Sequence, residues 1–178
     1  MILRAFTDKD LPKIRALYRE AFPLIERAPF ALLKKRAKEG RATMLVAVDR
    51  GAFCGFFYVL DDSELAYVFY FAVDPAQRGQ GRGSEMLALL RRYYSGKRLF
   101  LALEAPDDAA HNAEQRLRRW RFYERNGFVQ LPGHIKEGSV VFEVMGIGGR
   151  VHAEEYGRLV RAWCGKWYQR FVDLKLFD

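Results

Sequence analysis

Cysteine and histidine are scarce in this sequence of 178 residues, which contains two cysteines and three histidines. Cys54 and Cys164 are too few for the disulfide framework of a small secreted domain, and neither has metal-binding side chains at a suitable spacing. We therefore expect neither a disulfide scaffold nor a metal centre.

Long apolar stretches, repeats and low-complexity tracts are also missing. No apolar run approaches the roughly 20 residues that cross a bilayer, and Asp8 and Asp10 follow the opening Ile2–Phe6 segment too soon for a signal peptide. A hydrophobic content of 50% excludes a disordered chain, because a chain of this length buries most of its apolar surface on folding. We expect one soluble, cytoplasmic domain with no membrane partner.

Motifs for nucleic-acid and nucleotide binding are absent as well. The net charge of +8 suits nucleic acid, a polyanionic small ligand or simply a well-solvated surface. The basic residues are spread over several segments, with neither zinc-finger spacing nor an RNA-binding signature, and no Gly-Lys-Ser/Thr occurs. We favour a solvated surface with one anion site and expect no nucleic-acid partner.

Against these absences, the segment Val68–Ser84 is rich in information. It reads VFYFAVDPAQRGQGRGS, an apolar strand pattern that stops at Asp74–Pro75 and is followed by three glycines among basic and polar residues. A helix pattern begins directly after it. Glycine allows positive φ and a close approach of the backbone to a ligand, while a helix start offers unpaired N–H groups and a positive dipole end. The segment therefore predicts a site for a phosphorylated ligand.

The remaining pattern predicts an α/β (α+β) protein with antiparallel strands first and two strand–helix units after them. We expect strands at Ile2–Phe6, Thr43–Val48, Phe53–Leu60, Leu65–Val73, Leu99–Glu104, Phe128–Leu131 and Val140–Met145. We expect helices at Leu11–Phe22, Phe30–Glu39, Ser84–Tyr94, His111–Arg125 and Ala153–Phe171, and a loop at Pro132–Gly138. This order excludes a Rossmann fold, whose glycine turn follows the first strand.

Two motifs carry a resemblance to a known family. Arg78–Gly83 fits an R-x-x-G-x-G pattern, and Phe122–Phe128, FYERNGF, resembles F/L-Y-x-x-x-G-F, with a helix and a strand between the two motifs. From Ile2 to Met145 the chain resembles the GCN5-related N-acetyltransferases (GNAT). The resemblance implies the GNAT fold, a central mixed and mostly antiparallel sheet of about seven strands flanked by helices. It assigns residues 1–150 to that domain and 151–178 to an added C-terminal helix, which packs on the same domain or on the partner subunit of a homodimer.

The resemblance also implies acetyl-CoA as co-substrate, with no metal. Backbone N–H groups of the turn would wrap its pyrophosphate, and the strand end would pair with the pantetheine amides. The implied cofactor-binding residues are Phe71, Ala72, Val73, Arg78, Gly79, Gln80, Gly81, Arg82, Gly83, Ser84 and Asn112. His111 is an alternative to Asn112, and an asparagine at a helix start is also an ordinary N-cap.

Two proton transfers accompany attack of an amine on a thioester, and the resemblance supplies a residue for each. Tyr123 takes the position of the acid that protonates the leaving sulfur; a packing tyrosine on a helix face is the alternative. Glu104 resembles the glutamate that deprotonates the amine in ribosomal-protein-type acetyltransferases, although Pro106 departs from the usual pattern there. A solvated strand end is the alternative for Glu104, and Glu64 is the reserve candidate.

The resemblance implies an N-acetyltransferase, an acyltransferase acting on a primary amine of a small molecule or peptide. A non-catalytic acyl-CoA-binding or protein-interaction module of the same fold is the alternative. The acceptor stays open, because small amines, amino acids, antibiotics and protein N-termini all suit the fold. Two segments are expected to shape its pocket, one with Glu26 and Arg27 and one with His134 and Lys136.

Overall fold

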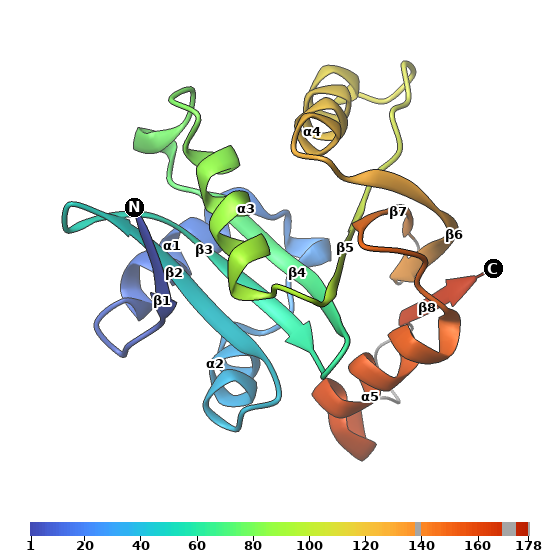
Figure 1. The fold of residues 1–178 in the computed structure, drawn as a ribbon, viewed down its shortest axis with the longest axis horizontal. Helices are drawn as coiled ribbons and strands as arrows, with labels where there is room; N and C mark the ends of the chain where they lie inside the picture. Colours follow the sequence, from blue (N-terminus) through green and yellow to red (C-terminus); the bar gives the residue numbers. More distant parts are fainter. Residues whose placement is uncertain (138–139, 169–173, 178) are drawn as a thin grey trace. The chain divides into compact units, whose positions relative to one another are not determined.

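The computed structural model describes residues 1–137, 140–168 and 174–177 (Figure 1). The chain forms two compact units, one made of Met1–Asp61 and Val68–Ser95, the other of Asp62–Tyr67 and Gly96–Asp178. Within the described ranges, no helix is both long and apolar enough to cross a membrane.

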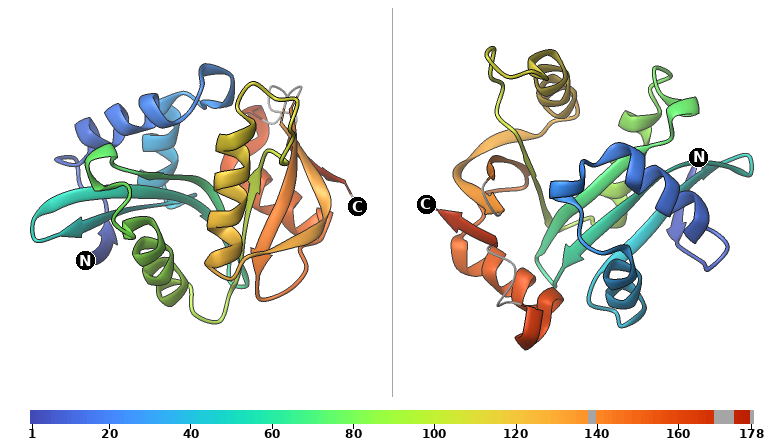
Figure 2. Two further views of the ribbon diagram at one scale, coloured as in Figure 1. Left: turned by 90° about the horizontal axis from the view of Figure 1, so that it is seen from above. Right: turned by 180° about the vertical axis from the view of Figure 1, so that it is seen from behind.

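The first unit is a sheet with helices on both faces. Its elements are β1 (Ile2–Ala5), α1 (Leu11–Ala21), the 3-10 turn η1 (Leu24–Glu26), α2 (Phe30–Lys38), β2 (Thr43–Asp49), β3 (Ala52–Asp61), most of β4 (Leu65–Val73), the 3-10 turn η2 (Pro75–Gln77) and α3 (Arg82–Tyr93). Strands β1, β2 and β3 pair antiparallel in chain order, and β4 follows β3 in the sheet. Helices α1 and α2 cover one face and α3 covers the other (Figure 2).

Two close contacts explain how this unit packs. The Tyr58 hydroxyl of β3 donates to the Leu33 carbonyl of α2 at 3.1 Å, which satisfies a buried phenol on that face. On the other face, a Cβ at Gly55 would lie 2.2 Å from the Ala72 carbonyl and 2.9 Å from Met86 Cε of α3. Only glycine fits there, so α3 sits close against the strands that precede it.

The second unit begins with the first residues of β4. Residues Leu65–Tyr67 pair parallel with β5 (Arg98–Leu103), which pairs antiparallel with β7 (Val140–Ile147). Strand β7 pairs with β6 (Val129–Glu137), and β6 pairs with β8 (Leu174–Phe177); the helices are α4 (Ala113–Arg125) and α5 (Ala153–Tyr168). Tyr67 stacks on Phe100 at 4.6 Å, and Tyr156 of α5 meets Tyr67 edge-on at 5.6 Å. These rings attach α5 to the sheet.

The predicted fold class is confirmed, and all seven predicted strands and five predicted helices are present. The predicted loop at Pro132–Gly138 is wrong, because β6 continues to Glu137 and places His134 and Lys136 in a strand. Pro132 and Gly133 form an irregularity within this strand, where the missing proline N–H costs no ladder bond. Strand β8 was not predicted. The predicted end of the last helix, Phe171, lies outside the described residues.

Candidate functional site

The glycine-rich turn leads directly into α3 in the first unit. Gly79 and Gly81 have φ values of 76° and 73°, and no described atom lies within 4 Å of the Cβ position at either residue. Helix α3 begins at Arg82, two residues before the predicted Ser84, and no described side chain caps it. The N–H groups of Arg82, Gly83 and Ser84 therefore point out of the helix start without an intrahelical partner. This arrangement suits an anionic ligand.

The side chain of Arg78 fixes the turn to its surroundings. Its Nε donates to the Val73 carbonyl at 3.0 Å, and its Nη2 donates to Glu20 of α1 at 3.1 Å. The side chain is half exposed. Arg78 thus joins the end of β4 to α1.

The other polar side chains of the turn are also engaged. Arg82 pairs with Asp49 at 2.8 Å and with Glu85 at 3.0 Å. Gln80 Nε2 donates to the Ala76 carbonyl at 3.3 Å. Since these side chains bind within the protein, the turn is held in a defined shape before any ligand arrives.

The proposed pantetheine platform, Phe71–Val73, forms the last three residues of β4 in the same unit. Phe71 stacks on Phe57 of β3 with ring centroids 4.4 Å apart, and Ala72 is buried. The strand therefore enters the glycine turn from a rigid, apolar base.

Glu104 lies in the second unit, directly after β5, and its carboxylate is held by residues at the start of α4. It accepts from Arg116 at 2.7 Å, from Arg119 at 2.6 Å and from Asn112 Nδ2 at 3.4 Å. Its side chain is only 15% exposed. Glu104 is therefore the anchor of a polar cluster and not a solvated strand end.

Asn112 precedes the first residue of α4 but does not act as the expected N-cap. Its Oδ1 accepts from Arg116 Nε at 2.8 Å, and it makes no capping hydrogen bond to a described backbone group. The structure thus places Asn112 and Glu104 together, through Arg116.

Tyr123 lies near the end of α4 and is half-buried. Its ring meets Phe122 and Phe128 at centroid distances of 5.2 and 5.5 Å. Burial raises the pKa of the phenol to about 12, and the charge of Arg119 acts in the opposite direction. Tyr123 is therefore protonated at neutral pH and has an arginine in its neighbourhood.

The two arginines of this cluster were not predicted as part of the site. Their spacing contained the signal, since Asn112, Arg116, Arg119 and Tyr123 follow one another at intervals of four, three and four residues. Residues at these intervals share one face of a helix. Glu104, just after the preceding strand, can form ion pairs with both arginines of this face.

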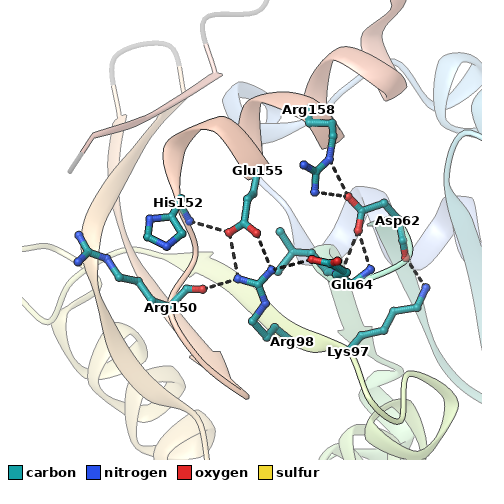
Figure 3. A network of polar contacts seen from close by, with 9 residues as sticks. Asp62, Glu64, Lys97, Arg98, Arg150, His152, Glu155 and Arg158 are labelled. Atoms are coloured by element: carbon teal, nitrogen blue, oxygen red, sulfur yellow. Dashed lines mark hydrogen bonds and ion pairs between the residues drawn. The ribbon is translucent and has the colours of Figure 1, made fainter.

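Glu64, the reserve base, belongs to a separate polar network (Figure 3). It is 71% exposed and lies 3.7 Å from Arg98 of β5. Arg98 pairs more closely with Glu155 of α5, at 2.5 and 3.0 Å, and Asp62 binds Arg158 of the same helix at 2.8 Å. This network attaches α5 to the strands, and Glu64 takes part in it through Arg98.

A model of the acetyltransferase (GNAT) domain matches residues 40–130 of the sequence. The chain belongs to the GNAT family of acetyltransferases. Members of this family use acetyl-CoA as co-substrate, and both sequence motifs described above lie within the matched range. The described residues contain no group of three or more histidine, cysteine or acidic side chains that could hold a metal ion.

Solved structures share the GNAT fold of this chain. A Bacteroides thetaiotaomicron protein assigned to the GNAT family is 24% identical, with a TM-score of 0.73 over 94% of this chain and 99% of the other. An aminoglycoside 6′-N-acetyltransferase complexed with coenzyme A is 15% identical, with a TM-score of 0.63 over 85% of this chain and all of the other. The ribosomal-protein-S18-alanine N-acetyltransferase of Escherichia coli is 19% identical, with a TM-score of 0.61 over 85% and 96%. No curated protein matched in sequence.

Proposed function

We propose that the protein is an N-acetyltransferase that transfers the acetyl group of acetyl-CoA to a primary amine by direct attack. The observation that carries this proposal is the turn before α3. Gly79 and Gly81 have positive φ and open space at their Cβ positions, and they lead into an uncapped helix start. These are the features that a bound pyrophosphate needs.

The backbone supplies most of the proposed co-substrate contacts. The N–H groups from Gly79 to Ser84 hold the pyrophosphate, and the strand end Phe71–Val73 pairs with the pantetheine amides and offers an N–H to the developing oxyanion. Asn112 is proposed to contact the pantetheine from the start of α4. The family resemblance suggests these roles, and the preorganised turn supports the first of them.

The proposed reaction needs one bond made and one broken. The amine nitrogen attacks the thioester carbon, the C–S bond breaks, and the sulfur leaves as a thiolate that takes the phenol proton of Tyr123. Before attack, the ammonium form of the acceptor gives one proton to Glu104, directly or through water. After attack, the nitrogen releases its second proton to water, and Glu104 and Tyr123 then exchange protons with solvent. The products are the acetylated amine and the free thiol of coenzyme A.

The role of Glu104 as base depends on how many hydrogen-bond acceptor positions of its carboxylate oxygens remain unoccupied. An ionised carboxylate offers about four such positions, and Arg116, Arg119 and Asn112 donate to three of them. One position is thus left for an ammonium group or a water molecule. The arginines meanwhile hold the carboxylate in place, which favours proton transfer over a fixed distance.

The substitution Tyr123→Phe tests the acid. We expect kcat to fall by about 10² or more, the range typical of a lost general acid, with little change in KM for acetyl-CoA. The control is Tyr93→Phe, at a 54% exposed tyrosine of α3. A rate equal to wild type at every pH would remove Tyr123 from this role.

The substitution Glu104→Gln tests the base through the pH dependence of the rate. We expect the greatest loss below the pH at which the amine loses its own proton, and recovery above it, because a free amine needs no base. An equal loss at every pH, together with a lower melting temperature, would show that Glu104 only anchors α4.

The double ion pair of Glu104 also favours a second candidate, a non-catalytic module that binds acyl-CoA. This candidate predicts thermal stabilisation by acetyl-CoA without release of thiol from any amine. An amine panel assayed for thiol release decides between the two, since an enzyme must release coenzyme A with at least one acceptor.

A further inference from the structure

The loop between α1 and α2 in the first unit is held rigidly by two tyrosines. The Tyr18 hydroxyl donates to the Ala28 carbonyl at 2.9 Å. The Tyr70 hydroxyl donates to the Glu26 carbonyl at 2.8 Å and accepts from the Ala28 N–H at 3.1 Å. The residues on both sides of Arg27 are therefore fixed, and Arg27 is presented from a preorganised backbone.

Arg27 is a half-buried cation whose charge is not neutralised within the described part of the chain. It makes no ion pair with a described carboxylate, and its buried Nε has no described hydrogen-bond partner. Its guanidinium lies close enough to the Tyr18 hydroxyl to act against the rise that burial causes in the pKa of that phenol. A buried polar atom without a partner is costly, so this position is suited to an external acceptor.

Two cations of α2 differ from Arg27 in that each forms an ion pair. On α2, Arg36 pairs with Glu39 at 2.7 Å, and Lys38 pairs with Asp8 at 2.8 Å. Arg36 also has a buried Nε without a described partner, but its guanidinium is neutralised by Glu39, whereas no described carboxylate pairs with that of Arg27.

The surroundings of Arg27 relate it to the proposed reaction. Tyr70, which holds the loop, directly precedes the strand end Phe71–Val73 that we propose as the pantetheine platform. On the loop itself, Leu24 and Ile25 are 78% and 74% exposed. The loop therefore combines one uncompensated cation with apolar side chains beside the strand that would carry the thioester.

We infer that the acceptor is a small amine that also carries a carboxylate, such as an amino acid, and that Arg27 binds this carboxylate; the inference rests on the proposed acetyltransferase function. A guanidinium binds a carboxylate through two parallel hydrogen bonds, which fixes both its position and its orientation. Leu24 and Ile25 contact the apolar part of such an acceptor. Polyamines and other polycations are repelled at this position.

The test compares acceptors that differ in one group. Phenylalanine, phenylalanine amide and phenethylamine share a ring and a primary amine, and only the first carries a carboxylate. We expect kcat/KM for phenylalanine to exceed that for the other two by at least tenfold. In Arg27→Gln this preference disappears through a higher KM for phenylalanine, whereas Arg27→Lys restores part of it.

The control is Lys35→Gln, which removes the same charge from a 67% exposed side chain on α2 and leaves the preference unchanged. Equal kcat/KM for phenylalanine and its amide, or a preference that survives Arg27→Gln, overturns the inference. A purely structural Arg27 would lower the melting temperature and affect all three acceptors alike, which also overturns it.

A binding measurement separates this inference from the proposed function. Calorimetric titration of N-acetylphenylalanine and its amide into the protein with coenzyme A bound reports carboxylate recognition without turnover. Binding that needs both the carboxylate and Arg27, but without thiol release from any amine, supports the inference and refutes the catalytic proposal. Thiol release that does not depend on a carboxylate in the amine supports the catalytic proposal and refutes this inference.

Discussion

Gly79 and Gly81 adopt a backbone conformation that other residues reach only with strain. Their φ values lie in the left-handed region, and their Cβ positions face space that no described atom occupies. The glycines are thus required by backbone conformation and not by internal packing. Gly40 has the same open space, so what distinguishes Gly81 is the uncapped start of α3 that directly follows it.

This distinction predicts the effect of Gly81→Ala. A left-handed alanine costs about 1–2 kcal/mol, and the added methyl group projects toward the proposed pyrophosphate. We expect the Kd for coenzyme A, measured by calorimetry, to rise at least tenfold. The control Gly40→Ala places the same strain at another glycine, with φ 69° and open space, and should lower stability equally while leaving the Kd unchanged. Equal Kd values in both variants would contradict the site.

At the scale of whole elements, ion pairs attach both C-terminal helices to the sheet of the second unit. Helix α4 is held through Glu104 after β5, and α5 is held through Glu155, which binds Arg98 of β5 (Figure 3). Both contacts join segments distant in sequence. Their removal should therefore affect stability more than the loss of an exposed charge.

For α5, the substitution Glu155→Gln tests this attachment. The hydrogen bonds from Arg98 hold the pKa of Glu155 below its ordinary value. The interaction therefore stabilises the folded state fully above the unfolded pKa, about 4.3, and is lost as the pH falls through the lower folded value. We expect the free energy of unfolding to drop by roughly 1–3 kcal/mol at pH 7, between values for exposed and buried pairs.

Urea unfolding at pH 7 and at pH 3.5 measures this effect. The difference between Glu155→Gln and wild type should shrink at the lower pH, because pH 3.5 lies below the unfolded pKa and the stabilisation by ionised Glu155 declines there. The matched control is Glu154→Gln, at an exposed residue of the same helical turn. A difference that is independent of pH would contradict the role of the ion pair.

At the scale of the whole molecule, the net charge of +8 favours an anionic co-substrate. Salt shortens the Debye length, the distance over which exposed charges interact, from about 10 Å at 0.1 M to about 3 Å at 1 M. We expect KM for acetyl-CoA to rise severalfold over this range while kcat changes by less than about twofold. An acetyl thioester of pantetheine, without the phosphates, is the control, and its KM should not change with the salt concentration. Equal salt dependence for both donors would contradict a charge-based contribution.

The elements themselves were largely predictable, because hydrophobic periodicity and glycine or proline positions are local signals. The errors lie where tertiary contacts override such signals. The predicted loop at Pro132–Gly138 is wrong, because pairing with β7 keeps the chain in β6 as far as Glu137, with a local irregularity between Leu131 and His134. The predicted start of α3 at Ser84 is two residues late, because Gly81 takes the N-cap position and the helix begins directly after it, at Arg82.

For the site, the glycine turn and helix start were enough to predict a phosphorylated ligand. The family and the co-substrate followed from the resemblance that this turn and the FYERNGF motif carry. The tertiary structure decided what each side chain meets. It paired Glu104 with two arginines of α4, engaged Arg78 and Arg82 within the protein, and left Arg27 without a described partner. Such pairings join residues far apart in sequence, and only the folded chain brings opposite charges within hydrogen-bonding distance.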